Sequence, residues 1–307
     1  MNAVGNPHKD VALTLSQGNA AGGASSQSMV QPGIELARGF SSRPLPLGLN
    51  GHFALLGGER LGPNGIAADL ALDWHPEFMR AVTQACDDLR IGGCPWFTMP
   101  PILLAGPAGV GRTHIARRLA TSAGLPHFVL DAAVDATFDP TAAPNVLLPL
   151  PPIVGMALTR CANPIVSVVN IERASTIALQ AITRLVDLRV SRRYVDEGLG
   201  VTLDLGAVNW LVHATEPNNL PIELASALLR VDLAMPEGQH FEIHIVDLVA
   251  EAVADLGVPA PDHEALMKMI DQLTQCGIGD STRHASNLSS AIRMWLRSET
   301  TSIPQIT

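Results

Sequence analysis

The chain has 307 residues and a formal net charge of −9, with 47% hydrophobic and 16% charged residues. Its length and apolar content allow a sizeable core and exclude a chain that is disordered throughout. The acidic balance argues against non-specific nucleic-acid binding, which depends on a basic surface, so no nucleic-acid partner is expected.

No membrane span is expected either. The most apolar stretch, residues 146–158, contains three prolines and is shorter than the ~20 residues that a spanning helix needs. The four cysteines, Cys86, Cys94, Cys161 and Cys276, are far apart and show no CxxC spacing. Such cysteines suit reduced thiols, and the first residues lack the apolar core of a signal peptide, so a cytoplasmic location is expected.

The first part of the chain alternates between unpatterned and periodic segments. Residues 1–66 are rich in Gly, Ala, Ser, Asn and Pro, which predicts a low-complexity, mostly disordered arm. A helix is predicted from Pro76 to the Gly92-Gly93 pair. A buried strand over 102–105 then enters a glycine-rich turn, and a second helix over 113–122 ends at Gly124.

Further strands are predicted at 128–130, 165–169, 201–205 and 208–213, with a helix over 176–188. Residues 132–150 have no clear period and are assigned to a loop. After Pro236, three apolar stripes at helical spacing predict three amphipathic helices. Strands that alternate with helices indicate a mainly parallel sheet. The predicted fold is therefore α/β, with an arm over 1–66, an α/β domain over 67–236 and a small α-helical lid domain over 237–307.

The turn after the strand at 102–105 reads GPAGVGRT. It has the spacing of the phosphate-binding loop GxxxxGK[ST], except that Arg112 replaces the lysine. Glycines let backbone N–H groups turn inward, and the following helix adds its positive end. The predicted nucleotide contacts are Gly106, Pro107, Ala108, Gly109, Val110, Gly111, Arg112, Thr113 and His114, with the Thr113 hydroxyl as an Mg²⁺ ligand. A glycine-rich turn that binds no ligand is the alternative.

From about Pro76 to Arg293, the chain resembles the AAA+ module of Lon-type proteases and of protease-less Lon-like ATPases. Besides the loop, the similar segments are CANPIVSVVNIERAS at 161–175, the segment 192–215 and the turn at 219–221. The resemblance implies a three-layer P-loop domain followed by a helical lid. It also implies ATP or ADP as the ligand, with Mg²⁺, and assembly into homo- or hetero-oligomers with AAA+ subunits.

The departures from the family pattern fall on reactive positions. Where the family has an Asp-Glu pair after the Walker B strand, this chain has Val169 and Asn170, and an amide cannot act as a general base. Glu172 lies two residues further on, as a displaced substitute. The sensor 1 position falls on Pro217, with Asn218 beside it. Ala227 replaces the subunit-bridging arginine, with Arg230 nearby, and Arg283 resembles the sensor 2 arginine of the lid.

Two further features bear on function. The substrate-gripping loop of the family would fall within residues 132–160, where Phe138 is the aromatic residue. His240 and His244 are four residues apart on a predicted helix, but they lack the HExxH pattern and read as surface histidines rather than metal ligands.

Three hypotheses result. The first is a degenerate Lon-like AAA+ protein that binds ATP or ADP, hydrolyses it weakly or not at all, and acts as a regulatory or scaffolding subunit. The second is an active ATPase that uses Arg112, Glu172, Asn218 and Arg230 as displaced residues. The third is an interaction module without nucleotide.

Overall fold

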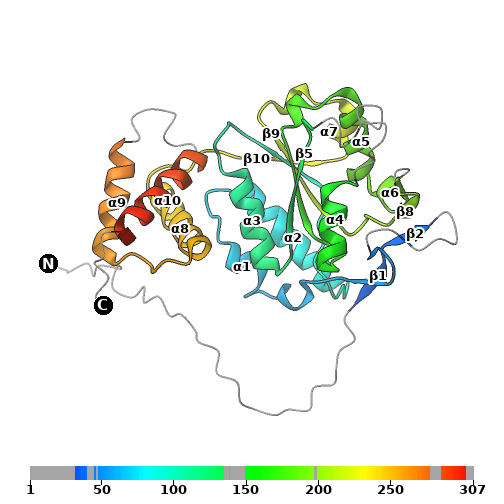
Figure 1. The fold of residues 1–307 in the computed structure, drawn as a ribbon, viewed down its shortest axis with the longest axis horizontal. Coiled ribbons are helices and arrows are strands. Elements are labelled where there is room, and N and C mark those ends of the chain that lie inside the picture. Colours follow the sequence, from blue (N-terminus) through cyan, green and yellow to red (C-terminus); the bar gives the residue numbers. More distant parts are fainter. Residues whose placement is uncertain are drawn as a thin grey trace, which may run out of the picture. The chain divides into compact units, whose positions relative to one another are not determined.

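A parallel sheet forms the centre of the fold (Figure 1). The computed structural model describes residues 32–39, 45, 48–134, 138, 149–196, 199–276 and 285–301. The sheet has the strand order β10-β4-β9-β6-β5, and every neighbouring pair is parallel. Its strands are β4 (Ile102–Ala105), β5 (His127–Asp131), β6 (Ile165–Val169), β9 (Asn209–Ala214) and β10 (Leu229–Asp232).

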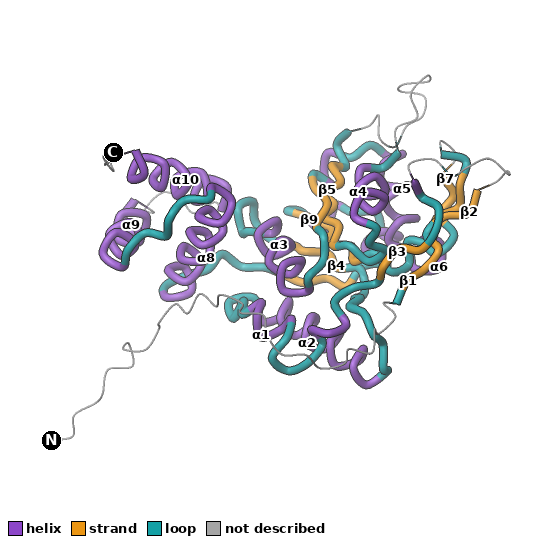
Figure 2. The backbone as a smooth tube through the Cα atoms, turned by 60° about the horizontal axis from the view of Figure 1, so that its bottom comes forward, coloured by secondary structure: helices purple, strands orange, loops and turns teal. Residues whose placement is uncertain are grey.

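Helices cover both faces of this sheet (Figure 2). Successive strand residues point to opposite faces, so Ile102 and Leu104 of β4 pack in one core and Leu103 packs in the other. The first core also holds α1 (Ile66–Leu70), α2 (Pro76–Ile91) and α3 (Arg112–Ala123). The second holds α4 (Pro151–Thr159) and α5 (Thr176–Val186). The predicted α/β fold, in three layers, is confirmed.

Most of the predicted core elements lie within one or two residues of their observed ends. Five short elements were missed: α1, α6 (Leu188–Ser191), α7 (Ile222–Ser226), β7 (Tyr194–Asp196) and β10. Helix α4 was missed as well, although its two prolines occupy the first helical turn, where a missing N–H costs no helical hydrogen bond. The predicted strand at 201–205 is shorter in the structure, as β8 (Val201–Leu203).

The prediction of a loose arm is wrong for its later residues. Residues 33–66 contain β1 (Gly33–Glu35), β2 (Ala37–Gly39) and β3 (His52–Ala54), a 3-10 turn at Gly58–Arg60, and the start of α1. Strand β1 pairs with β3, while β2 pairs with β8, which also pairs with β7. Leu36, Leu49, Phe53 and Leu55 are buried in the second core. Glycines and prolines interrupt the periodicity of these apolar residues, but long-range pairing buries them. Residues 1–31 lie outside the described residues.

Two buried asparagines lie at the amino end of the sheet, and the first of them holds this segment there. The Asn163 side chain accepts a hydrogen bond from the Leu56 N–H at 2.9 Å and donates to the carbonyl oxygens of Leu56 and Phe97. The Asn209 side chain accepts from the Met99 N–H and donates to the Asn163 carbonyl oxygen. Each amide therefore binds a backbone N–H that is more than a hundred residues away in the chain, Asn163 that of Leu56 and Asn209 that of Met99.

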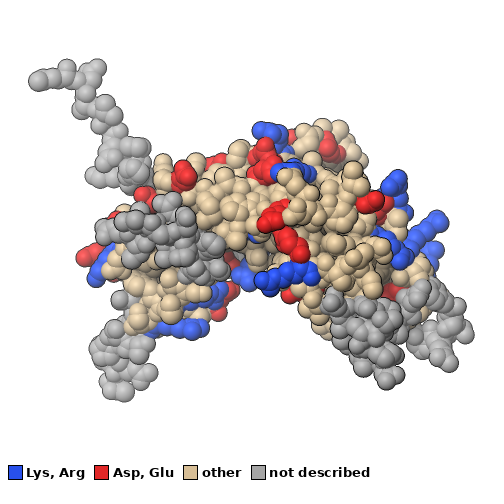
Figure 3. All heavy atoms as spheres, turned by 90° about the horizontal axis from the view of Figure 1, so that it is seen from above, with Lys and Arg blue, Asp and Glu red and all other residues tan. Residues whose placement is uncertain are grey.

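The three predicted C-terminal helices are confirmed as α8 (Gln239–Leu256), α9 (His263–Cys276) and α10 (Ala285–Thr301). Their apolar stripes form a core of their own around Ile245 and Ile292. No helix among the described residues is long and apolar enough to cross a membrane. On the face seen in Figure 3, acidic and basic side chains are interspersed.

Candidate functional site

The glycine loop joins β4 to α3 at the carboxyl end of the sheet. Gly109 and Gly111 have φ values of 85° and 92°, a conformation that side chains disfavour. A Cβ on Gly106 would lie 2.7 Å from the Leu233 carbonyl oxygen. Gly111 is the N-cap of α3 and offers no side-chain cap, so the first N–H groups of this helix remain available to an anion.

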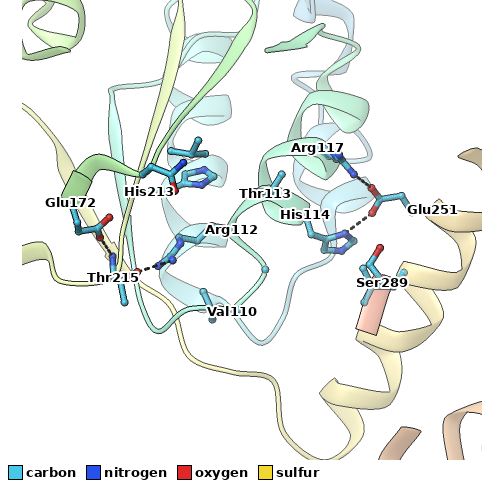
Figure 4. Close-up of a pocket in the computed structure, with 15 residues that line it drawn as sticks. Val110, Arg112, Thr113, His114, Arg117, Glu172, His213, Thr215, Glu251 and Ser289 are labelled. Carbon is cyan, nitrogen blue, oxygen red and sulfur yellow. Dashed lines mark hydrogen bonds and ion pairs between the residues drawn. The ribbon is translucent and has the colours of Figure 1, made fainter. Parts of the chain in front are cut away.

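A cavity of about 470 Å³ opens in front of this loop (Figure 4). Three groups of elements form its walls: the loop with the start of α3, the carboxyl ends of β6 and β9, and the helices α8 and α10. The lining residues are Gly109, Val110, Gly111, Arg112, Thr113, His114, Arg117, Val169, Asn170, Glu172, His213, Thr215, Leu248, Glu251 and Ser289. The structure thus brings six of the nine predicted loop contacts to one cavity.

Arg112 lines the cavity, but its guanidinium is already bound to the protein. It donates hydrogen bonds to the carbonyl oxygens of Gly106 at 2.5 Å and Ala214 at 2.8 Å, and to the Thr215 hydroxyl at 3.1 Å. Burial lowers the pKa of Arg112, and the charge of Glu172 opposes that shift. The side chain that replaces the usual lysine therefore connects the loop to the end of β9.

Val169 and Asn170, at the end of β6, also face the cavity. Val169 ends β6, and Asn170 follows it with a positive φ of 57°. The Asn170 amide donates to the Asp131 carboxylate at 2.9 Å. Glu172 lines the cavity as well, and its carboxylate accepts the backbone N–H of Thr215. Asp131 was not predicted, although its place at the end of the neighbouring strand β5 is a signal that could have found it.

His213, in β9, is a lining residue that the sequence did not indicate. It is 6% exposed, and its Nε2 has no hydrogen-bond partner among the described residues. Burial lowers the pKa of His213 to about 3, and the charges of Arg112 and His127 act in the same direction. The imidazole is therefore neutral at physiological pH and adds a polar group, but no positive charge, to the cavity.

The C-terminal helices supply the remaining wall through Glu251. This carboxylate contacts Nδ1 of His114 at 2.9 Å and a guanidinium nitrogen of Arg117 at 2.7 Å. The hydrogen bond to His114 is the main reason that the pKa of Glu251 falls to about 2, with Arg117 acting in the same direction. Neither Glu251 nor Ser289 belongs to a sequence motif, so only the tertiary structure reveals them.

Other predicted residues lie elsewhere. Arg230, on β10, forms an ion pair with Asp232 at 2.9 Å and donates to Asn218, and it does not line the cavity. Phe138 packs against the core. Arg283 lies outside the described residues. His244 is buried, contrary to the prediction of a surface histidine, because its ring packs between Trp74 and His114.

The residues fit a phosphate group better than a metal ion. The loop offers N–H groups, but Mg²⁺ in phosphate sites is usually bound through one or two carboxylates. The two carboxylates that line the cavity are already bound, because Glu172 accepts the Thr215 N–H and Glu251 contacts His114 and Arg117. Thr113 contributes a single hydroxyl. Among the described residues, no group of three or more His, Cys, Asp and Glu side chains could hold a metal.

No protein-family model matches the chain, and no curated protein matches it. Among solved structures, the chain is similar to a mutant of RuvB from Thermotoga maritima, with a TM-score of 0.41 and 15% sequence identity. That alignment covers 76% of this chain and 72% of the RuvB chain. The similarity concerns the backbone alone, and the roles of the residues follow from the geometry of the cavity.

Proposed function

We propose that this protein is a degenerate Lon-like AAA+ protein that binds ATP or ADP and hydrolyses it weakly or not at all. The loop supports the binding part of this proposal, because its glycine conformations and the uncapped end of α3 suit phosphate oxygens. The cavity in front of the loop has a volume of about 470 Å³, which leaves room for a bound ligand.

The contacts of Arg112 are the main support for the proposal of weak or absent hydrolysis. A catalytic cation must follow the transferred phosphoryl group as its charge changes. The guanidinium of Arg112 is instead held by two carbonyl oxygens and the Thr215 hydroxyl. This arrangement preserves the shape of the loop and leaves the backbone N–H groups as the main phosphate ligands.

The end of β6 supports weak hydrolysis. A general base accounts for ~10²–10⁴-fold of a rate, and the Asn170 amide has no basic atom to accept a proton from water. The Val169 side chain has no oxygen to hold a metal-bound water. We therefore expect nucleotide binding that depends little on Mg²⁺.

The active-ATPase alternative has one observation in its favour. Glu172, the displaced substitute for the missing base, lines the cavity. One of its carboxylate oxygens accepts the Thr215 N–H, so the other is the atom that would have to take a proton. In this alternative, Glu172→Gln would abolish turnover.

The biological role that suits these features is a regulatory or scaffolding subunit in the cytoplasm. A nucleotide that is held without turnover stabilises one arrangement of the loop and the C-terminal helices. Oligomerisation with like or related AAA+ subunits is part of the proposal and rests on the sequence resemblance. The cysteines Cys86, Cys94 and Cys161 are free, which suits a reducing compartment.

Isothermal titration with Mg·ATP and with Mg-free ADP, together with a turnover assay, tests the proposal. Ala108 is an exposed loop residue, so Ala108→Asp places a negative charge at the loop without disturbing the core. We expect it to weaken nucleotide binding by about tenfold or more. The matched control, Ala260→Asp, changes an exposed alanine between α8 and α9 and should bind as the unmodified protein does.

The outcomes separate the three hypotheses. Heat with both nucleotides and negligible turnover supports the proposal. Turnover that Glu172→Gln abolishes favours the active ATPase. An absence of heat with either nucleotide favours the third hypothesis, an interaction module without nucleotide.

A further inference from the structure

Several histidines meet where the C-terminal helices contact α3. The rings of His114, on α3, and His244, on α8, have centroids 5.1 Å apart in an edge-on arrangement. The Trp74 ring lies 5.9 Å from His75 and 5.9 Å from His244. We call Trp74, His75, His114 and His244 the histidine cluster. It joins residues that are up to 170 positions apart and that lie just before α2, on α3 and on α8.

The three histidines are buried and incompletely hydrogen-bonded. Their exposed fractions are 2% for His75, 7% for His114 and 4% for His244. Nδ1 of His75, Nε2 of His114 and Nδ1 of His244 have no partner among the described residues. A buried polar atom without a partner destabilises a fold, and a proton on such a ring would add a buried charge to that cost.

The charges around the cluster oppose protonation more than they favour it. Arg118 pairs with Asp247, and Arg117 and His114 pair with Glu251. The ring of His240, which is exposed, lies 6.1 Å from that of Trp74. The acidic groups near the cluster are thus already bound to cations, and the histidines have each other as neighbours.

Burial is the main cause of the resulting shifts. It lowers the pKa of His75 to about 4, with His114 acting in the same direction. It lowers the pKa of His244 to about 3, with His114, His75 and Arg118 adding to the effect and Glu251 opposing it.

We propose that the histidine cluster is a pH-sensitive latch, which holds the C-terminal helices against α3 at neutral pH and releases them when His75 and His244 take up protons. Release exposes both rings to water, where a histidinium is well solvated. It also separates Glu251 and Ser289 from the loop, so the cavity loses one of its walls.

The lowered pKa values of His75 and His244 determine the direction in which pH changes the stability of the closed contact. A histidine whose pKa is 6.5 when exposed and lower when buried stabilises the closed contact fully above pH 6.5. This contribution is lost as the pH falls from 6.5 toward 4 for His75 and toward 3 for His244. At pH 5, each of the two histidines weakens the closed state by up to about 30-fold relative to high pH. The transition therefore falls mainly between pH 6.5 and 4.

The latch concerns the protein without ligand, so its test is independent of nucleotide binding. Hydrogen–deuterium exchange, corrected for the intrinsic pH dependence of exchange, is measured at pH 7.5 and pH 5.0 on the full chain. We expect peptides from α3 and α8 to lose protection at pH 5.0 while β4 and β9 keep theirs. The retained sheet distinguishes release of the helices from global unfolding.

His244→Phe keeps an aromatic ring in the contact and removes its titration, so it should reduce the pH-dependent loss of protection by about an order of magnitude. The control, His263→Phe, changes an exposed histidine at the start of α9 and should respond as the unmodified protein does. Equal protection at both pH values, or an unchanged response in His244→Phe, would overturn the latch.

A second measurement applies if His244→Phe does not fold. The ring resonances of His75 and His244, followed by NMR in the unmodified protein, should titrate below pH 6. Titration of both rings at pH 6.5 would also overturn the proposal.

Discussion

The guanidinium of Arg112 donates a hydrogen bond to the carbonyl oxygen of Ala214 at 2.8 Å, which connects the glycine loop to the end of strand β9. The same group also binds the Gly106 carbonyl oxygen and the Thr215 hydroxyl. A lysine ammonium at this position could reach a phosphate, but it lacks the planar fork that satisfies several acceptors at once. Arg112 is therefore a structural element of the loop as well as a lining residue.

Replacing this arginine should destabilise the protein without creating an ATPase. Arg112→Lys leaves the acceptors at Gly106, Ala214 and Thr215 partly unsatisfied, and we expect a loss of about 1–3 kcal/mol in the free energy of unfolding. Urea denaturation measures this loss. Arg230→Lys, at an exposed pair with Asp232, serves as the control and should change stability little. Brisk ATP hydrolysis by Arg112→Lys would contradict the proposed function, because Val169 and Asn170 are unchanged.

The segment before residue 66 should contribute strongly to stability, although its composition predicts disorder. Phe53 is fully buried, and the Arg160 guanidinium lies 3.9 Å from the centre of its ring. Phe53→Ala should therefore lower the free energy of unfolding by about 3–5 kcal/mol. Leu158→Ala is the control, because Leu158 is 80% exposed. A small effect of Phe53→Ala would mean that the segment is as loose as its composition predicts.

The sequence predicts those elements whose residues carry their own local signal. Strand β4 and helix α3 are recognisable because a continuous apolar run, a glycine turn and a terminating glycine follow one another. Strand β10 has no such signal: its pattern, LRVD, becomes a strand only through pairing with β4. The same holds for β2, which pairs with β8 from a distant part of the chain.

The residues of the candidate site also differ in whether a local sequence signal marks them. The loop residues follow a spaced motif, and Val169 and Asn170 end a strand that the sequence predicts. The partners of Arg112 are two carbonyl oxygens and a hydroxyl, which no motif records. His213 and Glu251 reach the cavity through sheet order and through the contact of α8 with α3, so sequence spacing alone could not place them.

The buried asparagines should be as important for folding as the apolar core. Asn163→Ala removes the partners of the Leu56 N–H and of the carbonyl oxygens of Leu56 and Phe97. Each buried group left without a partner costs about 1–3 kcal/mol, so the variant should be strongly destabilised in thermal unfolding. Asn218→Ala, at an exposed position, should unfold at nearly the same temperature as the unmodified protein. Similar Tm values for both variants would show that water replaces the lost contacts of Asn163.

Glu251 and the histidines should give the protein two separate ranges of acid sensitivity. The pKa of Glu251 falls to about 2 from an ordinary value of 4.5, mainly through its hydrogen bond to His114. A lowered carboxyl pKa adds stability that is complete above pH 4.5 and is lost as the pH falls from 4.5 toward 2. His75 and His244 act at higher pH, since their contribution is lost below pH 6.5.

Glu251→Gln should therefore be less stable than the unmodified protein at pH 7. The difference should shrink as the pH falls, first as the latch opens between pH 6.5 and 4 and then as Glu251 takes up a proton from pH 4.5 toward 2. Urea denaturation at pH 7, 5 and 3 measures this difference. Glu242→Gln, at an exposed position near the start of the same helix, should show no such pH dependence. A constant difference between Glu251→Gln and the unmodified protein would mean that the amide replaces the carboxylate in its contacts with His114 and Arg117. In that case, the negative charge of Glu251 would not be what holds α8 against α3.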